Sequence, residues 1–131
     1  MSNLSSLFFS VAIFSAILLA LHFSILWMIP EPAYGYILMG HIFFFVATFL
    51  ILWIFSRSAE LMIEKAGFVF MGLEFLKGGA LVILLLLFEA RGKLDNIMLL
   101  NVMGIYLMHL FFSMFMGVKT LNKANKIITG K

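Results

Sequence analysis

An acid and a base lie close together inside a long apolar stretch of this sequence. Glu74 and Lys77 are three residues apart, so in a helix they share one face and can neutralise each other. Counted from the start of the stretch at Ala66, they would lie about 12 and about 17 Å deep, at about 1.5 Å per residue. Charged groups at such depth are costly and commonly mark a functional site. We interpret the pair as contacting an ion or a partner helix, with a self-contained salt bridge as the alternative.

Three histidines also lie in apolar stretches. His109 is expected at about the depth of Glu74 and Lys77, where it could hydrogen-bond to either. His22 and His41 belong to two different stretches, each in the outer third, and they form a candidate polar pair. Matched depth is what two axial haem ligands need, and it is also what a plain interhelical hydrogen bond gives. We favour packing and do not expect haem; the sequence does not say whether His22 and His41 meet.

Two glycines lie on the opposite face of the stretch that holds the acid and the base. Gly72 and Gly79 are two helical turns apart, and a groove of this kind lets a neighbouring helix approach closely. The stretch then has one face for polar contacts and one for close packing, which predicts a central position for it. Asn101, in the last stretch, is expected to make a packing contact.

The composition indicates that the solvent around these stretches is lipid. Of the 131 residues, 64% are hydrophobic and 11% are charged, and the mean hydropathy is +1.15, whereas soluble domains are about half apolar and about a quarter charged. The sequence therefore predicts an all-α fold, a four-helix transmembrane bundle forming one domain over residues 1–131. Short connectors make successive helices antiparallel neighbours. We expect helices at residues 7–29, 36–55, 66–88 and 97–118, with a basic tail at 119–131.

Basic residues are unevenly placed outside these helices. The N-terminus, the connector at residues 56–65 and the tail share Arg57, Lys65, Lys119, Lys123, Lys126 and Lys131, while the other side has Arg91 and Lys93. Cytoplasmic segments carry the excess of Lys and Arg, so both termini are expected in the cytoplasm, in a multi-pass protein of a bacterial inner (plasma) membrane. The charged connector could carry a short interfacial helix.

The lysine-rich tail has no acidic residue. We expect it to attract anionic lipid, with a partner-binding arm as the alternative and no role in nucleic-acid binding. The sequence does not decide whether the chain forms a homo-oligomer.

Sequence signatures of catalysis are missing. The chain has no Gly-x-Ser-x-Gly, no His-Glu-x-x-His and no phosphate-binding loop. It also has no cysteine, which excludes disulfides, thiolate metal sites and cysteine nucleophiles. We do not expect an enzyme.

The third stretch resembles the ATP synthase subunit I family, whose members are small four-helix membrane proteins. The resemblance rests on an aromatic and glycine lead-in, an acid, a base three residues later and a Leu-rich run, here Phe70, Gly72, Glu74, Lys77 and Leu81–Leu87. The family typically shows Gly-Glu-x-x-Lys at this place. In this chain Leu73 separates the glycine from the acid.

The resemblance implies a non-catalytic accessory or assembly factor of a membrane complex, the F-type ATP synthase. Members are associated with assembling or stabilising the ring of c subunits, and also with magnesium supply. Only Glu74 and Lys77 carry over as site residues. Our own hypothesis for their role is that Lys77 shields the mid-membrane carboxylate of a c subunit until the ring closes. Two alternatives remain open: a small ion- or proton-conducting protein using Glu74, Lys77 and His109 in an oligomeric path, and a haem-binding respiratory-complex subunit using His22 and His41.

Overall fold

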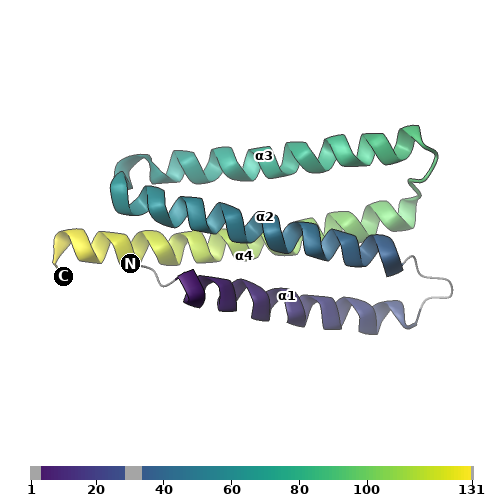
Figure 1. Cartoon of the computed structure of the whole chain (residues 1–131), viewed down its shortest axis with the longest axis horizontal. Helices are drawn as coiled ribbons and strands as arrows, with labels where there is room; N and C mark the ends of the chain where they lie inside the picture. Colours follow the sequence, from purple (N-terminus) through teal and green to yellow (C-terminus); the bar gives the residue numbers. More distant parts are fainter. Residues whose placement is uncertain (1–3, 29–33, 131) are drawn as a thin grey trace.

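The computed structural model describes residues 4–28 and 34–130. This part of the chain folds into α1 (Leu4–Leu26), α2 (Tyr34–Leu61), α3 (Ile63–Ala90) and α4 (Asn96–Thr129). All four helices are long and apolar enough to cross a membrane, which confirms the predicted all-α fold and makes the chain a multi-pass membrane protein. Successive helices run in opposite directions, so α1 begins at the end of the bundle where α4 ends (Figure 1).

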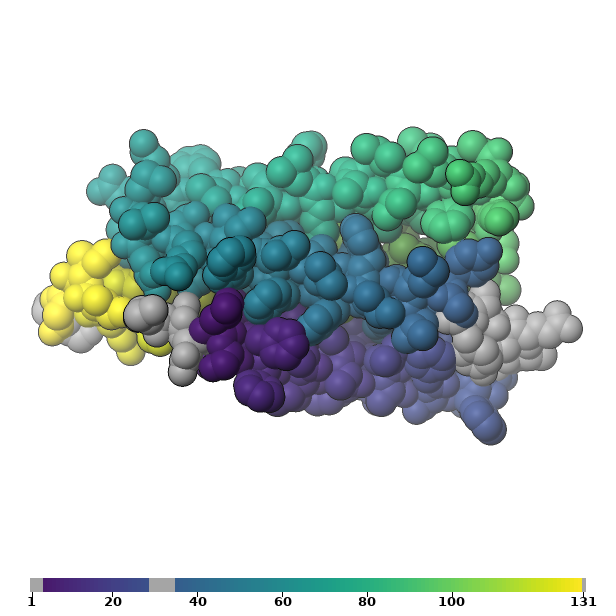
Figure 2. All heavy atoms as spheres, in the orientation of Figure 1, coloured from purple at the N-terminus to yellow at the C-terminus, as the bar shows by residue number. Residues whose placement is uncertain are grey.

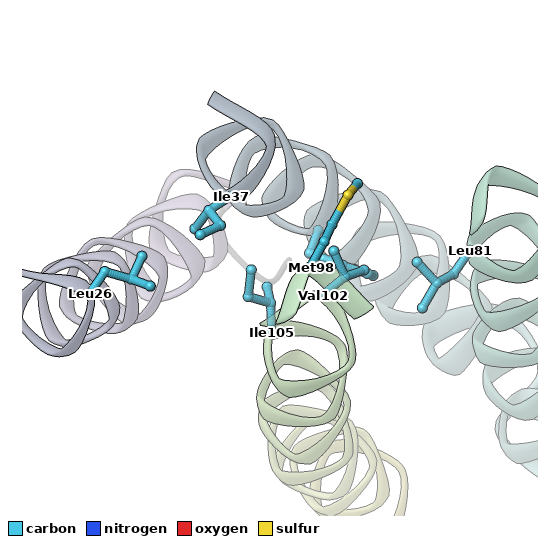
Figure 3. Close-up of a cluster of buried hydrophobic side chains, with 7 residues drawn as sticks. Leu26, Ile37, Leu81, Met98, Val102 and Ile105 are labelled. Atoms are coloured by element: carbon cyan, nitrogen blue, oxygen red, sulfur yellow. The ribbon is translucent and has the colours of Figure 1, made fainter. Parts of the chain in front are cut away.

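The central helix is α2. It packs against each of the other three helices, while α1 and α3 lie on opposite sides of the α2 and α4 pair (Figure 3). The expectation that residues 66–88 take the central position is therefore wrong. The physical reason is that α2 has a buried residue at nearly every turn. These residues form two rows, each with a spacing of seven residues: Ile37, Phe44 and Ile51 in one row, and His41, Thr48 and Phe55 in the other.

Three of the helices, α2, α3 and α4, extend further than the apolar runs that predicted them. The first helix is shifted instead: α1 starts at Leu4 and ends at Leu26, so the expected span of residues 7–29 is wrong at both ends, and residue 29 itself lies outside the described residues. Residues 56–65, expected as a connector with its own short helix, form the end of α2 and the start of α3, and Met62 alone separates the two helices, with φ −147° and ψ 72°. Hydropathy marks where apolar side chains stop, whereas a helix continues as long as its residues favour helical backbone. Arg, Ala, Glu and Lys do so.

The basic tail is helical as well, which corrects the expected helix end at residue 118. α4 starts at an Asp95 cap, whose side chain accepts a hydrogen bond from the Met98 N–H at 2.6 Å. It stops at Gly130, where a φ of 64° lets the Gly130 N–H donate to the Lys126 carbonyl. The 34 residues of α4 span about 51 Å at about 1.5 Å per residue, more than the ~30 Å apolar layer. Its last turns project beyond the other helices (Figure 2).

Apolar clusters join the helices at both ends of the bundle. Near the connection between α3 and α4, side chains from all four helices meet (Figure 3): Leu26, Ile37, Phe44, Leu81, Met98, Val102 and Ile105. At the other end, Phe55 packs with alanines of α2, α3 and α4: Ala59, Ala66 and Ala124. These small side chains let the three backbones approach closely. The buried residues of α1 are Leu7, Val11 and Leu26, so α1 is the least embedded helix.

Candidate functional site

Glu74 and Lys77 lie near the middle of α3, and both side chains turn into the bundle. The two residues are 8% and 4% exposed, and Oε2 of Glu74 lies 2.6 Å from Nζ of Lys77. Nζ also donates to Oγ of Ser113 on α4 at 3.5 Å and lies 5.8 Å from the ring centroid of Tyr106, within cation–π range. The pair therefore links α3 to α4 in the interior of the bundle.

Ser113 connects this pair to the backbone of α4. Its Oγ donates to the carbonyl oxygen of His109 at 2.8 Å, a bond that Ser commonly makes inside membrane helices, and it accepts from Lys77. Within residues 4–28 and 34–130, Oε1 of Glu74 has no hydrogen-bond donor. A buried pair with an unsatisfied oxygen is weak evidence for stability, because desolvation offsets much of the attraction.

His109 is fully buried on α4, but its imidazole makes no hydrogen bond to Glu74 or Lys77, contrary to expectation. Nδ1 of His109 lies 3.1 Å from Oγ1 of Thr48 on α2, and the described part of the chain offers no partner to Nε2. The rotation of α4 aims the imidazole at α2, while Ser113, one turn later, faces Lys77. The sequence predicts how deep His109 lies in the membrane, but it does not predict how α4 is rotated about its axis.

His22 and His41 do meet, and Asn101 joins them. Nδ1 of His22 lies 2.9 Å from Nε2 of His41, and Nε2 of His22 lies 2.6 Å from Oδ1 of Asn101. The Asn101 amide donates to the Ile97 carbonyl at 2.7 Å, which assigns Oδ1 as the acceptor. Nε2–H of His22 then donates to Asn101, and Nδ1 of a neutral His22 accepts from His41. This histidine row connects α2, α1 and α4, so Asn101 is a polar partner and not only a packing contact.

The histidine row does not fit a haem. Metal–imidazole bonds are about 2 Å long, so nitrogens on opposite sides of one metal lie about 4 Å apart. The two facing nitrogens of His22 and His41 are 2.9 Å apart and bond directly to each other. This geometry disfavours the haem-binding alternative.

A magnesium site does not fit the described residues either. Mg²⁺ takes a near-octahedral set of oxygen ligands. Within the described residues, Glu74 is the one buried acid, and it already pairs with an ammonium group. No group of three His, Asp or Glu side chains there could hold a metal ion.

An apolar layer separates the histidine row from the other buried polar groups. Phe44 lies between His41 and Thr48 along α2, and Ile105 lies between Asn101 and His109 along α4. Phe44 and Ile105 are 1% and 2% exposed. The Phe44 ring also lies 5.9 Å from the ring of His109, centroid to centroid. This apolar layer therefore lies between the histidine row and the buried polar groups around His109 and Lys77.

Among the residues that the structure describes, none packs against the outer face of α3 around Gly72 and Gly79. Gly72 and Gly79 are exposed, and a Cβ added to either would meet no atom within 4 Å. The close approach occurs at Gly78 instead, where an added Cβ would lie 3.0 Å from the Tyr106 hydroxyl. Large exposed apolar side chains surround the two glycines, namely Phe68, Phe75, Leu76, Ile83 and Leu86. We call this surface, Gly72 and Gly79 with these neighbours, the glycine face.

No family model, no curated protein and no solved structure matches this chain. The class of the molecule accordingly comes from its helices: a four-helix, multi-pass membrane protein.

Proposed function

We propose that this chain is a non-catalytic accessory or assembly factor of a membrane complex, the F-type ATP synthase, in a bacterial inner membrane with both termini in the cytoplasm. The observation that carries the proposal is the two-sided character of α3. On the inner side Glu74 and Lys77 tie the helix to α4, while the outer side exposes Gly72 and Gly79. The resemblance of this helix to ATP synthase subunit I proteins supports the choice of complex.

The geometry suggests a different role for Lys77 from shielding a partner's carboxylate. Its side chain is 1% exposed and already contacts Glu74 and Ser113, so it does not reach the outer face of α3. In our proposal the ion pair fixes the rotation of α3, which turns the glycine face outward. A c-subunit hairpin then packs on this face, where the lack of side chains lets two helices approach closely.

Co-purification of c subunits tests the proposal. We expect Gly72→Leu and Gly79→Leu each to lower the recovery of c subunits on the tagged chain about tenfold, which corresponds to about 1.4 kcal/mol. A branched side chain on the glycine face holds the partner helix away. Recovery is measured by immunoblot or mass spectrometry after extraction in mild detergent.

Gly104→Leu is the matched control. Gly104 is also an exposed helical glycine, on α4, with no atom within 4 Å of an added Cβ, so this variant should recover as much c subunit as the wild type. Equal recovery by all three variants contradicts the role of the glycine face. Recovery of no c subunit with the wild-type chain overturns the choice of ATP synthase.

Proton conduction is the second candidate, favoured by the buried ionisable groups Glu74, Lys77 and His109. The apolar layer of Phe44 and Ile105 argues against it, because a proton would have to cross side chains that neither donate nor accept hydrogen bonds. We therefore expect proteoliposomes with the wild-type chain to acidify no faster than protein-free liposomes under an imposed potential, measured with an internal pH dye. A proton flux that disappears in His109→Leu would favour conduction instead.

A further inference from the structure

One face of α4, in its last turns, borders a shallow hollow of about 470 Å³ that is open to the surroundings and has mixed chemistry. Its lining comes from α4: Phe115, Val118, Lys119, Asn122, Lys123 and Lys126. We propose that this hollow binds one anionic phospholipid of the adjoining leaflet, with its phosphate on the lysines and its acyl chain on the apolar residues. This proposal is independent of the partner complex proposed above.

Helical structure in the tail is what gathers the lysines. Lys119, Lys123 and Lys126 follow one another at intervals of four and three residues, which places them on one face of a helix. An extended tail would point them in different directions. Gly130 ends the helix after Lys126, so all three lysines belong to the helical part of the tail. Lys126 lies in the last turn, where its positive charge offsets the partial negative charge at the C-terminal end of the helix.

The order of chemistry along the hollow matches an amphiphile. Phe115 and Val118 are 66% and 59% exposed and end the apolar run, and Lys119 follows directly. A phospholipid has the same order, with hydrocarbon below and phosphate above. A water-soluble anion would use only the lysines and Asn122 and would leave the apolar floor uncovered. The hollow therefore fits a phospholipid better than free phosphate.

The three lysines are not equivalent. Lys123 also lines a second hollow of about 40 Å³ between α2 and α4, together with the carboxylate residue Glu60. Lys119 and Lys126 do not line that hollow. Because a nearby carboxylate competes with a phosphate for an ammonium group, we expect lipid binding to depend most on Lys119 and Lys126.

Native mass spectrometry of the full chain in detergent tests this site. Titration with phosphatidylglycerol and with phosphatidylcholine of the same acyl chains should show one retained phosphatidylglycerol at concentrations where phosphatidylcholine is not retained. Lys119→Gln/Lys126→Gln should weaken phosphatidylglycerol binding about 25-fold, since each basic residue near an anionic head group contributes about fivefold. Lys65→Gln/Lys93→Gln removes the same charge from exposed positions elsewhere and should leave binding unchanged.

Two further arms separate lipid from a free anion. Phe115→Ser should weaken phosphatidylglycerol binding, because the acyl chain loses an apolar side chain to pack on. Millimolar inorganic phosphate should not displace the lipid. Equal losses in the two double-lysine variants, or equal binding of phosphatidylcholine and phosphatidylglycerol, overturn the proposal. Displacement by inorganic phosphate together with an unchanged Phe115→Ser variant would show a site for a free anion and overturn the lipid assignment.

Discussion

Replacing Lys77 by methionine is expected to destabilise the bundle by about 3–5 kcal/mol, because it leaves a buried carboxylate without its partner. Glu74→Leu should cost a similar amount, since it leaves the Lys77 ammonium in the interior without a carboxylate, next to the Ser113 hydroxyl at 3.5 Å and the Tyr106 ring at 5.8 Å. The free energy of unfolding can be measured by titrating sodium dodecyl sulfate into mixed micelles while following helix content.

The double variant Glu74→Leu/Lys77→Met gives the sharper result. We expect its stability to lie within about 1 kcal/mol of the wild type or above it, because removing both charges also removes their desolvation cost. The exposed pair Arg57 and Glu60, whose charged atoms lie 3.8 Å apart, is the control, and its loss should change stability by less than about 1 kcal/mol. Additive losses in the Glu74 and Lys77 cycle would contradict this view of the pair.

The second large effect is expected at Phe44. Phe44→Ala should lower the free energy of unfolding by about 3 kcal/mol, because Phe44 is 1% exposed and its removal leaves a cavity between α2 and α4. The same titration measures it. Phe75→Ala is the matched control: Phe75 also lies near the middle of a membrane helix but is 82% exposed, so its loss should have little effect on folding. A stable Phe44→Ala variant would show that the core re-packs around the gap.

Hydropathy predicted the four helices because each apolar run is long enough to cross the lipid layer. It misplaced their ends, most clearly at residues 56–65 and 119–129, where charged residues continue the helices. A change from apolar to charged side chains marks the edge of the lipid and not the end of backbone hydrogen bonding. The same limit explains why the sequence predicted a connector where α2 and α3 nearly touch at Met62.

The site was predictable within one helix and much less so between helices. The spacing of Glu74 and Lys77 fixes their common face, whereas the direction of His109 depends on how α4 is rotated against α2. Thr48 and Ser113 gave no signal, because hydroxyls in membrane helices usually bond to their own backbone. Ser10, Ser24 and Ser58 do so here, each donating to a carbonyl four residues earlier. The predicted groove glycines face outward, and Gly78 takes the close contact.

The reversal at Met62 makes α2 and α3 a single mechanical unit. Because a single residue connects them, neither helix can slide along the other, and a displacement of α3 also displaces the adjoining end of α2. Since α2 packs against all the other helices, a tilt of α3 would change the packing of every helix in the bundle.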